Sequence, residues 1–271
     1  MENVYITKVI LEEVRNLTYA EIPLSTKEKK NLIITGKNGS GKTTVLNALA
    51  SYLNAVFESN GIEHEKKYLK MDEENLDYSK THGGTESEIR EFEGRVYDRK
   101  DRLTLLKHGI EIELNCLGEH AHQLFQDGRV ILAYYKADRV FRTDIPRHVE
   151  KVQLQNQYSI DENPRDNLVK YLLDLKMTQA LSATNGKQEK AADIQRWLDN
   201  FEKLLQKIFE NKQLKLEFDE ETFKFSIKEP EKEAYDFNSL SSGYAAILDI
   251  VVDLMIRMEK QTNRTFQYDI P

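Results

Sequence analysis

The chain has 271 residues, of which 39% are hydrophobic and 31% charged, with a formal net charge of -7 and a single cysteine, Cys116. This length suffices for one large domain or two small ones. No apolar run approaches the roughly 18 residues of a membrane span, the N-terminus lacks a signal-peptide layout, and one cysteine excludes an internal disulfide. A cytoplasmic protein is therefore expected, and the negative charge argues against a protein coated with nucleic acid, although a local basic patch is compatible with it.

The first 24 residues predict two strands. Residues 5–9 alternate weakly between apolar and polar side chains, and residues 14–19 predict a second strand that residues 22–24 close. One aromatic here, Tyr5 or Tyr19, is a candidate for stacking on an adenine, with packing against the sheet as the commoner alternative. A charged turn then leads into the next strand.

Residues 36–43, Gly-Lys-Asn-Gly-Ser-Gly-Lys-Thr, fit the pattern G-x-x-x-x-G-K-[ST] of a phosphate-binding loop. The apolar run 31–35 predicts a short buried strand before the loop, and residues 44–57 predict a helix after it. Strand, glycine-rich turn and helix are the context that this motif needs. The predicted nucleotide site therefore comprises Gly36, Lys37, Asn38, Gly39, Ser40, Gly41, Lys42, Thr43 and Thr44.

The residue types of this loop suit a bound triphosphate. Glycines let the backbone curl so that successive N–H groups point inward, and the helix N-terminus adds unpaired N–H groups and the positive end of its dipole. The Lys42 ammonium would lie between the β- and γ-phosphates, and the Thr43 hydroxyl would ligate Mg²⁺. ATP and Mg²⁺ are the expected ligands, and a plain glycine-rich turn is the alternative.

Residues 58–109 are strongly charged, and Gly83-Gly84 interrupts them. We expect exposed helices and loop inserted into the nucleotide domain, because a charge run is usually a solvated face. A surface that docks a partner is the alternative.

Two further strands are predicted next. Residues 110–114 alternate cleanly and predict a half-buried strand, and residues 129–135 predict a more apolar one. Polar groups follow the second strand at its end, where α/β sheets hold their ligands. Asp138 and Arg139 would face the nucleotide or a partner, or pair with each other at the surface.

The following hundred residues predict a helical region and a hairpin. Residues 161–164 resemble a helix start, residues 165–181 form a helix with leucines on one face, and residues 188–211 form a second amphipathic helix. Residues 214–218 and 223–227 predict a β-hairpin. The stripe of the second helix is expected in the core rather than at a cofactor: Ile194, Trp197, Phe201, Leu204, Leu205 and Ile208.

Residues 237–244, Phe-Asn-Ser-Leu-Ser-Ser-Gly-Tyr, form a second motif. They precede a helix over residues 245–258 that is apolar nearly all round. A Ser-Ser-Gly turn before a buried helix offers a second anion-binding helix end. The signal is weak alone, and the glycine loop earlier in the chain strengthens it.

Together the two motifs resemble the ATP-binding-cassette (ABC) ATPases, and more closely their RecF, Rad50 and SMC-like branch. Leu240-Ser241-Ser242-Gly243-Tyr244 is similar to the signature written LSGGQ, and Arg15-Asn16-Leu17 followed by residues 32–44 is similar to the opening of RecF- and SMC-type proteins. Asn38 is typical of that branch. The order of motifs also resembles stand-alone bacterial ATPases of anti-phage systems such as Septu and certain retrons, where an HNH nuclease accompanies the ATPase.

The resemblance implies an α/β P-loop ATPase with an ABC-type central sheet, N-terminal antiparallel β elements and a helical subdomain. Its segments would be strands, P-loop and first helix (1–57), charged helical insertion (58–109), nucleotide-domain strands (110–160), helical subdomain (161–211), and hairpin, signature and helix (212–271). Two copies would pair head to tail around two ATP molecules. Lys42 and Thr43 of one copy would hold the phosphates and Mg²⁺, and Ser241, Ser242 and Gly243 of the other would contact the γ-phosphate.

Such a homodimer would control a nuclease of HNH type or a DNA-processing partner, in phage defence or DNA repair. A non-hydrolysing, nucleotide-sensing dimerisation module is one alternative. The ATPase subunit of an ABC transporter is another, and it would require a separate membrane subunit.

The chain departs from this family after the signature. No apolar run ending in Asp-Glu follows Gly243, and Asp249 and Asp253 lie inside the predicted helix. We therefore expect that the chain stops at Pro271 before its Walker B strand, lacks a catalytic residue and the C-terminal part of the fold, and hydrolyses ATP poorly. The glutamine of the Q-loop is ambiguous: Gln153, Gln155 or Gln157. His120 and His122 are expected in a loop rather than at a metal site, and no nuclease motif is visible.

Overall fold

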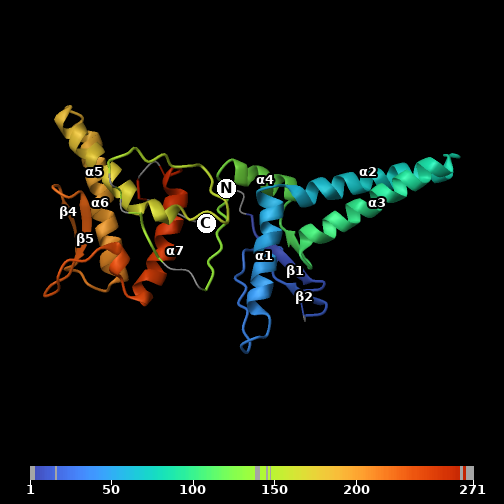
Figure 1. Cartoon of the computed structure of the whole chain (residues 1–271), viewed down its shortest axis with the longest axis horizontal. Helices are drawn as coiled ribbons and strands as arrows, with labels where there is room; N and C mark the ends of the chain where they lie inside the picture. Colours follow the sequence, from blue (N-terminus) through green and yellow to red (C-terminus); the bar gives the residue numbers. More distant parts are fainter. Residues whose placement is uncertain are drawn as a thin grey trace. The chain divides into compact units, whose positions relative to one another are not determined.

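The computed structural model describes residues 4–15, 17–137, 141–144, 146, 148–262 and 265–266. The chain divides into two compact units, Met1–Leu132 and Ala133–Pro271 (Figure 1). Each unit buries its own set of apolar side chains. Among the described residues, no helix is long and apolar enough to cross a membrane.

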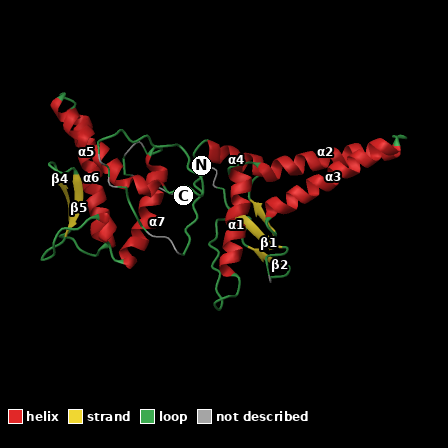
Figure 2. Cartoon of the chain, in the orientation of Figure 1, coloured by secondary structure: helices red, strands yellow, loops and turns green. Residues whose placement is uncertain are grey.

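The first unit contains a three-stranded antiparallel sheet (Figure 2). Its central strand β1, Ile6–Leu11, pairs with β2, Ala20–Pro23, on one side and with β3, Ile110–Leu114, on the other. Side chains alternate across β1, so Thr7, Val9 and Leu11 are buried. The predicted N-terminal antiparallel elements and the strand over residues 110–114 are confirmed.

The predicted strand over residues 14–19 is wrong. Val14 and Leu17 are joined by an isolated bridge instead, and their backbones exchange hydrogen bonds of 3.2 and 3.0 Å. Arg15 has a φ of 57°, in the left-handed region that turns use. The chain therefore reverses here, and the residues that pair with β1 come after the turn.

Helix α1, Lys42–Phe57, lies against this sheet and buries Val45, Tyr52 and Val56. Helix α4, Gly118–Gln126, packs on α1, where the rings of Phe57 and Phe125 meet edge to face with centroids 6.3 Å apart. The loop predicted around His120 and His122 is therefore wrong, because both residues lie on α4. A helix of nine residues gives too short a pattern to stand out in the sequence.

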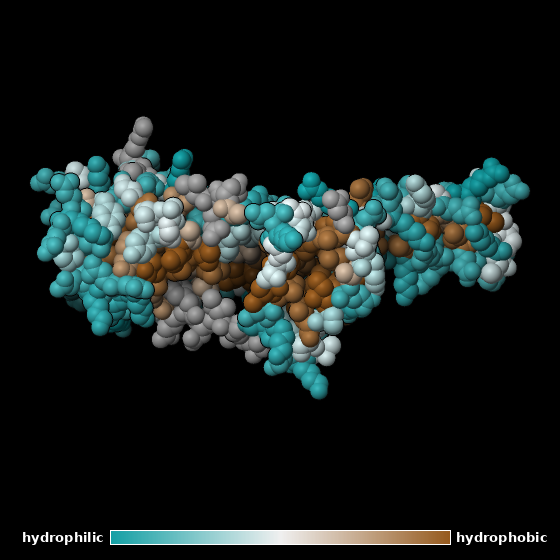
Figure 3. Space-filling view, turned by 90° about the horizontal axis from the view of Figure 1, so that it is seen from below, coloured by the Kyte–Doolittle hydropathy of each residue, from teal (hydrophilic) through white to brown (hydrophobic). Residues whose placement is uncertain are grey.

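Helices α2, Gly61–Thr81, and α3, Glu86–Lys107, form an antiparallel hairpin (Figure 1). Ion pairs join the two helices, among them Lys80–Glu93 at 2.8 Å and Lys100–Glu73 at 2.9 Å. The chain turns between them at Gly83, whose φ of 78° suits glycine. Hydrophilic side chains cover most of the outer end of the hairpin (Figure 3). The expected exposed helices in this charged segment are confirmed.

Two predicted strands are not formed. Residues 31–35 and 129–135 run as irregular chain, and the Ile33 side chain is 81% exposed. A strand exists only where a neighbour completes its hydrogen bonds, and within the described residues no segment pairs with either run. The ABC-type central sheet expected from these two segments is therefore not formed by the described part of the chain.

The second unit is mainly helical. Helices α5, Leu168–Thr184, and α6, Gln188–Ile208, pack together, and α7, Ser242–Glu259, joins their core. Strands β4, Lys215–Asp219, and β5, Lys224–Lys228, form the predicted hairpin. Two short 3-10 helices, Pro164–Asn167 and Phe237–Ser239, precede α5 and α7.

The predicted stripe of α6 is confirmed as core. Ile194, Trp197, Phe201 and Leu205 are buried, while Leu204 and Ile208 are half-buried against the same cluster. Trp197 lies at the centre: its ring stacks on Phe201 at 5.6 Å and meets Tyr171 edge to face at 5.4 Å. Such pairs add to the free energy gained by burying the rings.

Candidate nucleotide site and signature helix

The glycine loop lies between an irregular segment and the start of α1. Gly39 and Gly41 have φ values of 80° and 89°, which a residue with a side chain adopts only under strain. A β-carbon on Gly36 would lie 2.7 Å from the Ser40 Oγ, so the two ends of the loop approach closely. The amide of Ser40 donates to the Lys37 carbonyl at 3.2 Å and closes the turn.

Lys42 lies over the mouth of this loop. Its Nζ donates to the carbonyl oxygens of Gly36 and Lys37, both at 2.8 Å. Residues 36–40 and Thr43 are exposed, and residues 41, 42 and 44 are half-buried. The structure thus places the nine predicted residues in one contiguous segment, the loop of residues 36–41 and the first turn of α1, with the Lys42 ammonium bonded to the loop.

The groups in this loop fit a triphosphate. Gly41 is the N-cap of α1, where no side chain caps the helix, and no acidic residue lies in its first turn. The first backbone N–H groups of a helix have no carbonyl one turn earlier to accept them, so they are available to an anion. Thr43 offers an exposed hydroxyl, which suits Mg²⁺ because this ion takes few protein ligands and completes its shell with phosphate oxygens and water.

The aromatic candidates for adenine stacking lie in the same unit. The Tyr5 hydroxyl donates to the Thr26 carbonyl at 3.1 Å. Tyr19 is exposed, and its hydroxyl bonds to the Glu21 carboxylate. The stacking role stays a prediction.

The signature segment, residues 241–243, forms the exposed start of α7 in the second unit. Ser241 is the N-cap, yet its side chain makes no capping hydrogen bond, and the first turn contains no acidic residue. A β-carbon on Gly243 would meet no atom within 4 Å. The next residue, Tyr244, stacks on Phe209 with ring centroids 4.3 Å apart and anchors this end of the helix. A second helix N-terminus with available N–H groups therefore points into open space.

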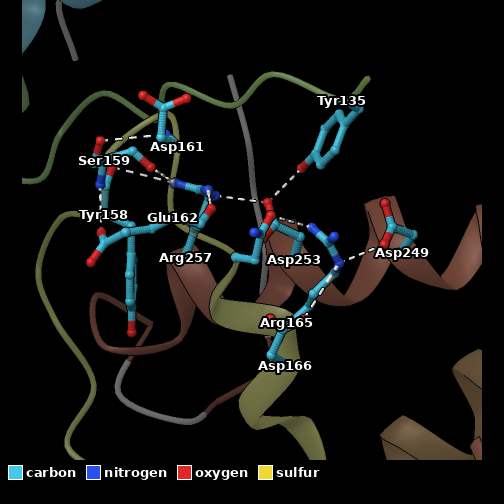
Figure 4. A network of polar contacts seen from close by, with 11 residues as sticks. Tyr135, Tyr158, Ser159, Asp161, Glu162, Arg165, Asp166, Asp249, Asp253 and Arg257 are labelled. Carbon is cyan, nitrogen blue, oxygen red and sulfur yellow. Dashed lines mark hydrogen bonds and ion pairs between the residues drawn. The ribbon is translucent and has the colours of Figure 1, made fainter. Parts of the chain in front are cut away.

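Further along, α7 carries buried charges that the sequence did not predict (Figure 4). Asp249, Asp253 and Arg257 follow at four-residue spacing, and both aspartates are 0% exposed. The expectation of a helix apolar nearly all round is therefore wrong. The spacing itself was the available signal, because residues four apart share one helix face.

Each buried carboxylate on this face has an arginine partner. Arg257 Nε donates to Asp253 Oδ2 at 2.7 Å. Arg165 Nε lies 2.5 Å from Asp249 Oδ1, in an ion pair whose alignment falls short of a hydrogen bond. Two aspartates thus face two arginines, and this balance is what allows such charges to be buried.

Tyr135 and a nearby loop complete the network (Figure 4). The Tyr135 hydroxyl donates to Asp253 Oδ2 at 2.8 Å. Burial, with the Asp253 charge adding to it, raises the pKa of Tyr135 above its ordinary value, so the hydroxyl keeps its proton and acts as a donor. The Arg257 guanidinium also donates to three carbonyl oxygens, those of Tyr158 at 3.3 Å, Ser159 at 3.1 Å and Glu162 at 2.7 Å.

The remaining candidates are dispersed. Asn16, Asp138 and Arg139 lie outside the described residues. In the segment before α5, Gln153 and Gln155 are exposed and Gln157 is half-buried. His122 Nδ1 lies 2.7 Å from the Phe57 carbonyl. Within the described ranges, no group of three or more His, Cys, Asp or Glu side chains could hold a metal ion.

Comparison with known proteins places these features in one family. A model of the AAA domain matches residues 8–247, which include both the glycine loop and the signature segment. This AAA domain is that of a P-loop ATPase family. No curated protein and no solved structure was found to match the chain.

Proposed function

Since the chain belongs to the AAA domain family of P-loop ATPases, we propose that it binds ATP with Mg²⁺ in the loop of residues 36–44 and then pairs with a second copy. The signature segment of each copy would contact the γ-phosphate held by the other. The observation that supports this proposal is the presence of two exposed, uncapped helix starts. One follows the glycine loop and carries Lys42, and the other follows Ser241.

Lys42 is the main phosphate ligand in this proposal. Its ammonium bonds two neutral carbonyls at 2.8 Å, and a phosphate offers the stronger, charge-assisted hydrogen bond. The backbone N–H groups at the start of α1 hold the remaining oxygens, and the Thr43 hydroxyl ligates Mg²⁺. When bound, Mg²⁺ neutralises charge on the β- and γ-phosphates.

The signature segment supplies the second set of donors. Ser241 and Ser242 bring hydroxyls, and the first turn of α7 brings backbone N–H groups and a positive helix end. One such end cannot close around a ligand by itself, whereas two copies offer both ends to each ATP. ATP then stabilises the pair by binding it better than the separated chains.

We propose that ATP holds the pair together and that these residues turn it over slowly. Asp249 and Asp253 are buried in ion pairs with Arg165 and Arg257, so neither aspartate is available to support Mg²⁺ or to activate water. Without such a carboxylate, hydrolysis loses contributions worth orders of magnitude in rate. This observation favours a nucleotide-sensing dimerisation role.

The pair would in turn control a protein partner, a nuclease or another DNA-processing enzyme, in defence against phage or in DNA repair. The resemblance to stand-alone ATPases that accompany HNH nucleases supports this partner class. The net charge of -7 favours a protein partner over extensive coating of nucleic acid.

The decisive experiment titrates ATP and Mg²⁺ into the protein and measures both the Kd for ATP and the mass of the complex. Lys42→Ala should weaken ATP binding roughly tenfold to a hundredfold, because charge-assisted hydrogen bonds contribute about 1.5–3 kcal/mol. Lys67→Ala removes the same side chain from an exposed position of α2, outside the loop, and should leave the Kd nearly unchanged. Equal effects of the two substitutions would contradict the assigned role of Lys42.

Substitutions at Gly243 test the contact between copies in the same titration. The open space around this residue accepts a side chain without refolding. Gly243→Glu should preserve ATP binding and abolish pairing, because a carboxylate would face the γ-phosphate of the second copy. Gly243→Lys has a similar length and the opposite charge, and it should pair better than the glutamate variant. Identical pairing by both variants would show that no phosphate lies there.

A further inference from the structure

The contacts of Tyr135, Asp253 and Arg257, together termed the α7 latch, join three segments of the second unit. Tyr135 belongs to the irregular chain at the start of the unit, Asp253 and Arg257 belong to α7, and Arg257 also holds carbonyl oxygens of residues 158–162. Arg165 forms an ion pair with Asp249, one helical turn closer to the signature end of α7. The latch therefore fastens one face of α7 by directional contacts rather than by apolar packing alone.

Tyr135 has a special place in the chain. The first unit, which contains the glycine loop, ends at Leu132, and the second begins at Ala133. Tyr135 is thus the third residue after the chain leaves the unit that contains the predicted ATP site. Its bond to Asp253 spans 118 residues of sequence and ties this exit segment directly to the signature helix.

The geometry of a helix makes such a tie effective. Asp253 lies ten residues after Gly243, which corresponds to about 15 Å along a rigid helix at 1.5 Å per residue. A small tilt of the α7 axis about the latch would move the signature end by a much larger distance than it moves Asp253. Because buried ion pairs require good geometry, the closed latch fixes the orientation of α7.

We infer that Tyr135, Asp253 and Arg257 are positioning residues that hold the signature end of α7 in register with the exit segment, so that bound ATP leads to pairing only while the latch is closed. The inference rests on the proposed function. Its specific content is that ATP binding and ATP-dependent pairing separate when the latch is opened, because no latch residue belongs to the loop of residues 36–44.

The same helix offers a matched control. The Tyr171 hydroxyl donates to Glu259 Oε1 at 2.9 Å, at the opposite end of α7. Tyr135→Phe and Tyr171→Phe each remove one phenol donor from a buried carboxylate of α7. Only the first substitution removes a bond between the exit segment and α7.

The experiment compares the wild-type chain with both phenylalanine variants. Three quantities are measured: the Kd for ATP, the dimer dissociation constant at saturating ATP and Mg²⁺, and the unfolding midpoint. We expect the unfolding midpoint of both variants to fall somewhat and the Kd for ATP to stay nearly at the wild-type value. Pairing should weaken about tenfold or more in Tyr135→Phe, a typical size for coupling between sites, and should stay within about twofold in Tyr171→Phe. Amide exchange in the first turns of α7 should accelerate only in Tyr135→Phe.

Other outcomes are distinguishable. Wild-type pairing in Tyr135→Phe would overturn the inference and leave the proposed function standing. An equal loss of pairing in both variants would also overturn it, because the effect would then follow the stability of α7. If the wild-type chain itself fails to pair with ATP, the proposed function falls and the inference falls with it.

Discussion

At the scale of single residues, the hydroxyls of Tyr52, Tyr135 and Tyr171 each donate a hydrogen bond to an acceptor distant in the sequence. Tyr135 and Tyr171 donate to carboxylates of α7, and Tyr52 donates to the Ile112 carbonyl at 3.4 Å. Tyr52 is 2% exposed, and burial raises its pKa to about 12. Because this phenol is held neutral in the folded state, the stability of the first unit should fall at alkaline pH.

Tyr52→Phe should remove this sensitivity. An unfolded tyrosine loses its proton near pH 10, whereas folded Tyr52 keeps it to about pH 12. The folded state therefore binds more protons across this window, and stability is complete below pH 10 and falls as the pH rises toward 12. The loss should approach about 1–3 kcal/mol, since one pKa unit corresponds to about 1.4 kcal/mol.

Urea unfolding at pH 8 and pH 11 measures this effect. The difference in unfolding free energy between wild type and Tyr52→Phe should shrink at the higher pH. Tyr97→Phe, which changes an exposed side chain, should show a constant difference. A constant difference for Tyr52→Phe would contradict the raised pKa.

The residues of the two helix starts were predictable, whereas the latch was predictable only in part, through the four-residue spacing of Asp253 and Arg257. Gly39, Gly41 and Lys42 are encoded by a local spacing, because the backbone of the loop itself requires those residue types. Asp253, in contrast, depends on Tyr135, which lies 118 residues away. No local pattern identifies a partner so far away in the sequence. A charged residue in an apolar helix therefore indicates that a polar contact exists, but it does not identify the residue that makes it.

At the scale of elements, the α2/α3 hairpin depends on polar contacts more than on a core. Apart from Ile62, Asp72 and Val96, its side chains are at least partly exposed. Arg99 lies 3.0 Å from Glu65 and 3.4 Å from Asp72, and its guanidinium stacks over the Tyr68 ring. Exposed ion pairs individually contribute little to stability. Capping at the ends of these helices is therefore a larger part of what stabilises the hairpin.

Thr85→Ala should loosen the start of α3. The Thr85 Oγ1 accepts from the Glu88 amide at 3.3 Å, and a Glu88 carboxylate oxygen accepts from the Thr85 amide at 2.8 Å, which is a capping box. Its loss should destabilise the hairpin by about 1 kcal/mol, seen as faster amide exchange in the first turn. Thr104→Ala is the control, because that hydroxyl only donates to the Lys100 carbonyl of its own helix. Equal acceleration in both variants would argue against the cap.

Helices were predicted better than strands for a physical reason. An amphipathic helix such as α6 satisfies its own backbone, so its stripe of buried residues was visible in sequence. A strand depends on a neighbour. Residues 110–114 found theirs in β1, while the equally apolar residues 31–35 did not pair within the described chain.

At the scale of the whole molecule, the two units bury separate cores. Trp197 is the single tryptophan, and it lies in the core of the second unit. Its fluorescence therefore reports the unfolding of that unit, while circular dichroism reports helices in both. Comparing the two signals therefore distinguishes unfolding of the second unit from unfolding of the first.

Ile110→Ala and Leu172→Ala should separate these signals. Both side chains are 0% exposed, in the first and second unit respectively, and such truncations cost about 2–5 kcal/mol. Leu172→Ala should shift the fluorescence transition, and Ile110→Ala should shift only part of the dichroism transition. A fluorescence shift of equal size in both variants would mean that the units unfold as one.

The lysine that lies across the glycine loop has a kinetic consequence. Because its ammonium group is already held in place by two carbonyl oxygens, an arriving triphosphate exchanges partners with it and does not have to organise the loop first. Capture should then proceed at a speed set by diffusion and charge, and discrimination among nucleotides should reside in how slowly each one leaves.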